Sequence, residues 1–108
     1  MKNTDELNAL MLELLEGNSD LEAGTFTARG REIINEIADY AEKTDIFKRE
    51  KQEGEKVFEK FTAHSVFTHM LTKLDQAPAD LFVTCTILIC MPFVRQKLKE
   101  EDADDEKI

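Results

Sequence analysis

The sequence lacks tryptophan and has one tyrosine among its 108 residues. Exposed aromatic rings are the platforms on which sugars and nucleobases stack, so their scarcity argues against a site of that kind. There are two prolines and four glycines, so regular elements can run long between breaks. Hydrophobic residues make up 42% of the chain. A single domain of this length can therefore bury a core without a disulfide or a metal to hold it.

Cysteine is also scarce, and both cysteines, Cys85 and Cys90, lie inside an apolar run. Five residues apart on one helix, they are separated by about 500° of rotation and point in roughly opposite directions. A disulfide between them is therefore geometrically poor. We expect two buried thiols that act as small hydrophobes in a reducing compartment. A catalytic cysteine–histidine pair is not expected, because apolar surroundings raise the pKa of a thiol.

Basic residues are too scattered to form a surface for phosphate groups. The formal net charge is −9, and the negative charge is concentrated at the two ends of the chain. Residues 1–26 hold six acids and one lysine, and residues 99–108 hold six acids and two lysines. Direct nucleic-acid binding depends on a concentrated basic stripe, so it is not expected.

No apolar run is long enough to predict a membrane span. The most apolar stretch, Leu81 to Val94, has 14 residues and lies between Asp80 and Arg95, whereas a membrane span needs about 20. Residues 1–20 also lack the basic and then apolar regions of a secretory signal. We therefore expect no membrane contact and a cytoplasmic location.

Hydrophobic periodicity predicts two amphipathic helices in the first half of the chain. The first ends at Gly17, and residues 17–26 are predicted to form a loop. The second runs from about Thr27 into the forties. Their apolar residues recur at helical spacing: Leu7, Leu10, Met11, Leu14 and Leu15 in the first helix, and Ile33, Ile34, Ile37, Ala38 and Ala41 in the second.

The middle of the chain is harder to divide. Residues 44–56 are nearly all charged, and Gly54 is predicted to mark a break before a third helix from about Glu55 to Leu74. The apolar face of that helix rotates by more than 90° along its length. A bend near residues 62–65, or a position between two neighbours, would explain this rotation. Whether the second and third helices are continuous stays open.

The last element, which follows Ala77-Pro78, has no polar side between Leu81 and Val94. Such a run is typical of a fully buried helix or a buried strand. We favour a helix, because no other segment offers a strand partner and basic residues follow at its end. The sequence thus predicts an all-α bundle of four or five helices over residues 1–99, with the last helix central. An acidic, disordered tail is predicted over residues 100–108.

No constellation of side chains predicts catalysis or metal binding. His64 and His69 are five residues apart, so they cannot form the i, i+4 pair of a zinc helix. We interpret His64 as a partly buried, hydrogen-bonded core residue and His69 as exposed. Glycine-rich phosphate loops, nucleophile elbows and Cys-x-x-Cys pairs are absent from the sequence. We therefore expect a protein that is not an enzyme and that holds no cofactor and no metal.

The leading hypothesis for function is a non-enzymatic protein–protein interaction module, such as a regulator, an inhibitor or an assembly factor. Acidic ends and a helical pattern are shared by many small accessory proteins of phages and mobile elements, although no motif assigns this chain to a family. One alternative is an acidic DNA mimic that occupies the nucleic-acid site of a partner, as the charge of −9 suggests. A second alternative is a bundle that binds a small ligand near His64 and the cysteines.

The partner is expected to be another protein, and a second copy of the chain is the first candidate. The last two predicted helices carry more apolar surface than the first two can easily cover, and a symmetric dimer is the commonest solution. The interface is predicted from apolar residues on those two helices: Phe67, Met70, Leu74, Met91 and Phe93.

Overall fold

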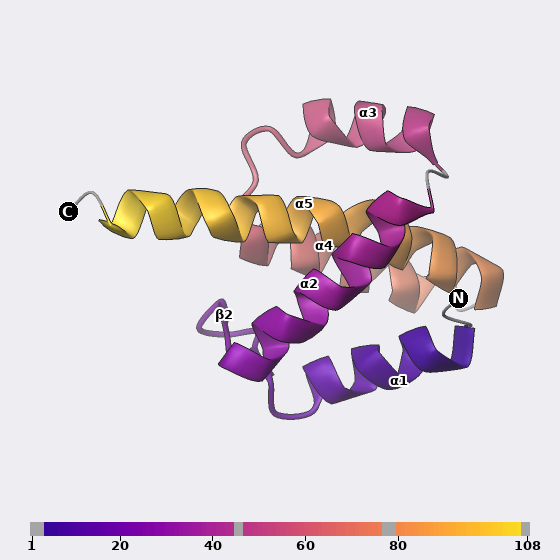
Figure 1. The fold of residues 1–108 in the computed structure, drawn as a ribbon, viewed down its shortest axis with the longest axis horizontal. Helices are drawn as coiled ribbons and strands as arrows, with labels where there is room; N and C mark the ends of the chain where they lie inside the picture. Colours follow the sequence, from indigo (N-terminus) through magenta and orange to yellow (C-terminus); the bar gives the residue numbers. More distant parts are fainter. Residues whose placement is uncertain (1–3, 45–46, 77–79, 107–108) are drawn as a thin grey trace.

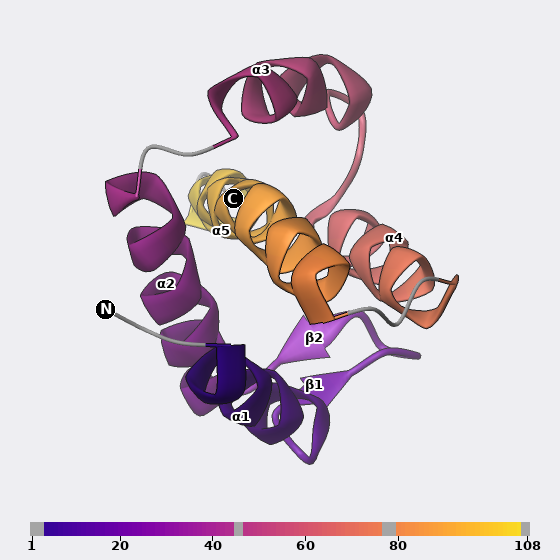
Figure 2. The same cartoon turned by 90° about the vertical axis from the view of Figure 1, so that its right-hand side faces the viewer.

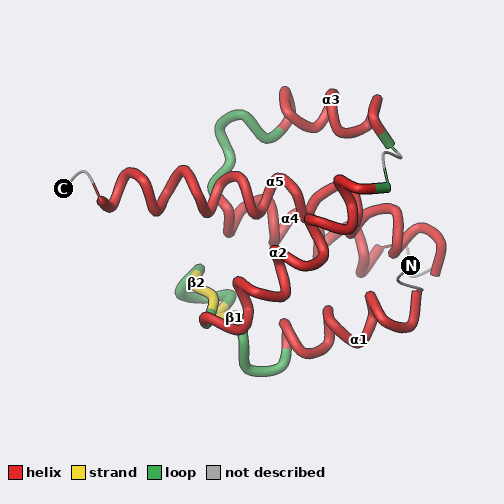
Figure 3. The backbone as a smooth tube through the Cα atoms, viewed as in Figure 1, coloured by secondary structure: helices red, strands yellow, loops and turns green. Residues whose placement is uncertain are grey.

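The part of the chain that the structure describes, residues 4–44, 47–76 and 80–106 of this computed structural model, is almost entirely helical (Figures 1 and 3). The predicted all-α bundle is confirmed, with five helices in these ranges. A short hairpin, with two strands of two residues each, lies between the first two helices. The elements in chain order are α1 (Thr4–Leu15), β1 (Ser19–Asp20), β2 (Thr25–Phe26), α2 (Ala28–Lys43), α3 (Lys48–Val57), α4 (Ala63–Gln76) and α5 (Asp80–Glu106).

Helix α5 is the centre of the bundle, as its apolar sequence predicts. Figure 2 shows α2 and α4 on either side of it, α1 and the hairpin on one side, and α3 on the opposite side. Ile87, Met91 and Val94 are buried, and Arg95 of α5 pairs with Asp39 and Glu42 of α2. The stretch 81–103 is also long and apolar enough to cross a membrane by length and composition. The core helix of a domain in water meets the same test, and 44% of the most apolar window of this helix is buried inside the bundle.

The predicted faces of α1 and α2 agree closely with the observed burial. All five predicted apolar residues of α2 are buried, and α1 buries Leu7, Met11 and Leu14. Leu15, at the end of α1, is exposed. A hydrogen bond of 3.0 Å from the N–H of Gly30 to Oγ1 of Thr27 caps the start of α2. The two helices therefore form one wall of the core.

The hairpin between α1 and α2 replaces part of the expected loop. Ser19 pairs with Phe26 and Asp20 with Thr25, in antiparallel register. Strands of two residues are too short to show an alternating pattern in the sequence, so periodicity could not reveal them. Gly17 has a φ of 93°, which favours glycine where the chain leaves α1.

The predicted third helix is wrong in its boundaries. Helix α3 begins at Lys48, before the predicted start, and ends at Val57. A new helix, α4, begins at Ala63, within residues 62–65, where a bend was one of the two predicted explanations for the rotated apolar face. Gly54 does not mark a break. It lies buried inside α3, so close to α5 that a Cβ atom there would come within 2.7 Å of the ring of Phe93. Phe47, at the start of α3, has a φ of 59°, so α2 and α3 are separate helices.

The helical part of the chain also extends beyond the predicted boundary at residue 99. A disordered tail is predicted from residue 100, whereas α5 continues to Glu106 in the structure. Asp102 pairs with Arg31 of α2 at 2.7 Å, and Glu101 accepts a hydrogen bond of 3.0 Å from the N–H of Ala63 at the start of α4. Partners this distant in sequence cannot be inferred from a run of acids. Residues 107–108 lie outside the described residues.

Candidate docking groove

The residues predicted to form an interface lie mostly inside the core of a single chain. Phe67, Met70 and Met91 have no exposed surface, and Phe93 is also buried, while Leu74 is partly buried against the same core. Phe26 of the hairpin covers Phe67 in an edge-to-face contact with 5.1 Å between ring centroids. The apolar excess that predicted a dimer is therefore largely covered within one chain. In this conformation the five residues present no shared exposed face.

His64 fastens the hairpin loop to α4. Its Nε2 lies 2.7 Å from the carbonyl oxygen of Leu21, which can only accept, so the imidazole donates. Gly24 lies against the same ring, so close that a Cβ atom on it would be 3.2 Å from Cγ of His64. His64 therefore has a structural partner, and a ligand site near the cysteines gains no support from it. Among the described residues, no group of three His, Cys, Asp or Glu side chains could hold a metal ion.

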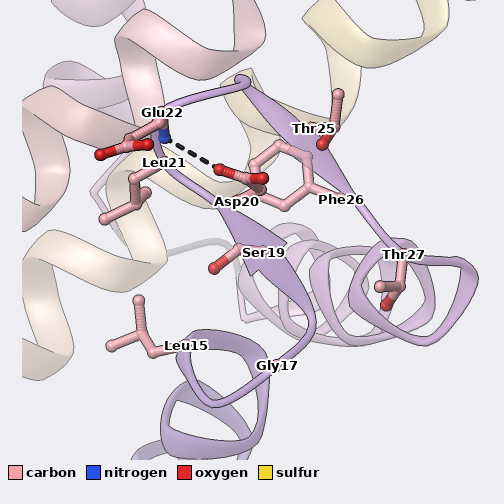
Figure 4. A pocket seen from close by; sticks show the side chains of 9 residues that line it. All are labelled: Leu15, Gly17, Ser19, Asp20, Leu21, Glu22, Thr25, Phe26 and Thr27. Carbon is pink, nitrogen blue, oxygen red and sulfur yellow. Dashed lines mark hydrogen bonds between the residues drawn. The ribbon is translucent and has the colours of Figure 1, made fainter.

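A shallow hollow of about 550 Å³ lies where the hairpin meets the end of α1 (Figure 4). Leu15, Asp20 and Phe26 line it with the neighbouring loop residues. The Asp20 carboxylate already accepts hydrogen bonds from the N–H groups of Glu22 (3.1 Å) and Ala23 (3.0 Å). Figure 4 shows this side chain pointing along the loop toward Glu22. Because the Asp20 carboxylate stabilises the turn in this way, it is less available to bind a ligand in the hollow.

A more apolar hollow of about 360 Å³ lies between α3, α4 and the first half of α5. We call it the α3 groove. Eleven residues from the three helices and the turn after α3 line it: Glu50, Glu53, Gly54, Val57, Phe58, His69, Lys73, Phe82, Thr86, Ile89 and Cys90. Two of its large apolar side chains are exposed, with 57% of Val57 and 43% of Phe82 accessible to solvent.

The groove exists because α3 cannot cover α5 fully. Phe82, Thr86 and Ile89 recur at i, i+4 and i+7 on α5 and form a stripe toward α3. Gly54 is the only buried residue of α3. The first turns of this helix are charged and have no apolar side chain to place on the stripe. Contact is made further along α5, where the rings of Phe58 and Phe93 lie 5.2 Å apart. N-terminal to that contact, Phe82 is exposed and Ile89 is partly exposed, while Thr86 between them is buried.

The two rims of the groove carry opposite charges. Glu50 and Glu53 lie on the α3 rim, and Lys73 lies on the α4 rim beside His69. The imidazole of His69 packs edge-on to the ring of Phe58, with 5.5 Å between centroids. At the floor, burial raises the pKa of the Cys90 thiol to about 11, with Lys73 opposing that shift. The groove therefore has an apolar floor between an acidic and a basic rim.

Alkylation of the folded chain should distinguish the two cysteines. At pH 8, iodoacetamide should modify the partly buried Cys85 at least about tenfold faster than the buried Cys90. A pKa of about 11 leaves Cys90 roughly a hundredfold less thiolate than the ordinary thiol pKa of 9.0 would. Mass spectrometry of digested samples over time measures both rates, and guanidinium should make the rates similar. Equal rates in the folded chain would mean that the groove floor is open to solvent.

Comparisons with protein-family models, curated proteins and solved structures gave no match for this chain.

Sequence reasoning missed the groove, although it named several of the residues that line it. Val57, Phe82 and Ile89 all have the apolar character and helical spacing of core residues. Which of them stay uncovered depends on where α3 packs. The charge of residues 48–53 is the one signal that could have indicated a poorly covered helix.

Proposed function

We propose that the chain is a non-enzymatic protein–protein interaction module and that the α3 groove is its docking surface. The observation that carries the proposal is an apolar hollow between charged rims, with Val57 and Phe82 exposed in its lining. Exposed apolar surface that is rimmed by polar residues is typical of protein interaction sites. The two free cysteines fit a reducing, cytoplasmic setting.

The arrangement of the acids favours this function over DNA mimicry. A mimic needs carboxylates spaced about as densely as duplex phosphates and free to meet a basic partner. Several carboxylates here are instead paired with arginines of the same chain: Glu13 and Glu32 with Arg29, Asp102 with Arg31, and Asp39 and Glu42 with Arg95. Such pairing reduces the negative potential that a mimic would present.

Substitution of Phe82 by glutamate tests the proposal. The affinity-tagged variant should recover at least about tenfold less of its specific partner from lysate of the source cell, because a charge in the apolar groove must be desolvated. Phe82 is already 43% exposed, so the fold should survive. Quantitative mass spectrometry of the captured proteins measures the loss, and circular dichroism checks the fold.

Leu12→Glu is the matched control, because Leu12 is 57% exposed on α1, on the opposite side of α5 from α3 (Figure 1). It should leave the captured proteins unchanged. If Phe82→Glu and Leu12→Glu both retain the partner, the groove is not the docking surface. Light scattering on the unmodified chain should give a mass near 12.4 kDa. A doubled mass that Phe82→Glu returns to that of a monomer would make a second copy the occupant.

A further inference from the structure

The size of the α3 groove suits a short segment better than a folded domain. Eleven residues line it, whereas a standard interface between globular proteins uses roughly 20–30 residues on each side. The stripe of α5 that lines the groove runs from Phe82 to Ile89, which corresponds to about two helical turns, or roughly 10 Å. An occupant therefore needs only two or three apolar anchors over a similar length.

The walls of the groove favour a helical occupant over an extended one. An extended peptide that docks through its backbone needs a strand edge to pair its N–H and C=O groups. The described walls are helices, and the described strands, Ser19–Asp20 and Thr25–Phe26, lie on the other side of α5 (Figure 2). A helix satisfies its own backbone and can place side chains at i, i+4 and i+7 on the apolar floor.

The charges at the rims specify the edges of that helix. Glu50 and Glu53 face the groove from α3, so a basic side chain suits that edge. Arg49 reaches Glu53 at 3.4 Å, but both side chains are well exposed, so this pair is weak. Lys73 disfavours a second basic edge along α4. The net charge of −9 also disfavours a second copy of the chain, because the two copies would repel each other.

We infer that the α3 groove binds a short amphipathic helix of another protein, with lysine or arginine along the edge that faces α3. This inference rests on the proposed function and specifies its partner. The apolar anchors of the partner contact Phe82, Ile89 and Val57, and its basic edge meets Glu50 and Glu53. The anchors supply affinity, whereas the rim charges select the partner and its orientation.

Two synthetic helical peptides test this inference on the full chain. Both carry the same leucine and phenylalanine anchors at i, i+4 and i+7, and they differ only in having lysines or glutamates along one edge. Calorimetry should show the lysine peptide binding at least about tenfold more tightly than the glutamate peptide. In the double variant Glu50→Lys/Glu53→Lys this preference should reverse, and Phe82→Glu should remove binding of both peptides.

The control is Glu16→Lys/Glu22→Lys, which makes the same change in net charge at the end of α1 and in the hairpin loop. It should keep the preference for lysine. An equal effect of both double variants would show general charge attraction and overturn the inference. If neither peptide binds, the partner class is wrong, and partner capture that is sensitive to Phe82→Glu would still support the proposed function. If no peptide binds and partner capture is also insensitive to Phe82→Glu, both the helical-partner inference and the proposed function are overturned.

Discussion

Replacing Ile87 by alanine should lower the free energy of unfolding by about 2–5 kcal/mol. Ile87 is 1% exposed in the first half of α5, on the side of the helix that belongs to the core. The substitution removes apolar atoms from the core and leaves a cavity that rigid helices can close only in part. Urea or guanidinium denaturation followed by circular dichroism measures the change. A domain of this size has little stability to spare, so the midpoint should fall visibly.

Leu81→Ala on the same helix is the control for this substitution. Leu81 is 78% exposed, so its removal should change the unfolding free energy by less than about 0.5 kcal/mol. The pair separates loss of core packing from a general effect of alanine in α5. An equally small change for Ile87→Ala would mean that α5 is not the centre of the bundle.

The amphipathic helices show where the sequence alone was sufficient. The face of α2 repeats at helical spacing, and every residue assigned to it is buried. The choice of a helix over a strand for α5 is also confirmed, with Ile87 and Leu88 both nearly fully buried. In these cases one local pattern determines both the element and the side that it buries.

The boundary between α3 and α4 shows where local patterns were not sufficient. Gly54 normally weakens a helix, yet here its lack of a side chain lets α3 approach Phe93 of α5. The rotation of the apolar face did indicate a change near residue 62. It could not distinguish a bend from the full break over residues 58–62, because contacts distant in sequence, such as that of Ala63 with Glu101, help to set where α4 begins.

The candidate site depended even more on tertiary packing. The apolar surplus of the last two helices was real, but Phe26 of the hairpin covers Phe67 inside the chain. The surplus that remains exposed includes Val57 and Phe82, in the groove that the charged α3 leaves open. A sequence gives the amount of apolar surface. Which part stays uncovered follows from the packing of a helix that contributes few apolar contacts.

Replacing Gly30 by alanine should destabilise the chain by at least about 2 kcal/mol. This runs against the usual gain of about 1 kcal/mol for the same change inside a helix. A Cβ atom on Gly30 would lie 2.3 Å from the backbone oxygen of Asn18, which is too close for any real contact. Thermal unfolding should show the loss as a fall of roughly 10 °C in Tm.

The clash at Gly30 is costly because Asn18 is held in place. Its backbone oxygen accepts a hydrogen bond from the N–H of Thr27 (3.1 Å), and its side chain bonds both Glu13 and Thr27. Gly54→Ala provides the comparison, since its new Cβ would lie 2.7 Å from the end of the Phe93 side chain, whereas that of Gly30→Ala would meet backbone. We expect Gly54→Ala to cost clearly less than Gly30→Ala. The reverse order, or a gain in stability for Gly30→Ala, would mean that the corner between α1 and α2 is looser than this packing implies.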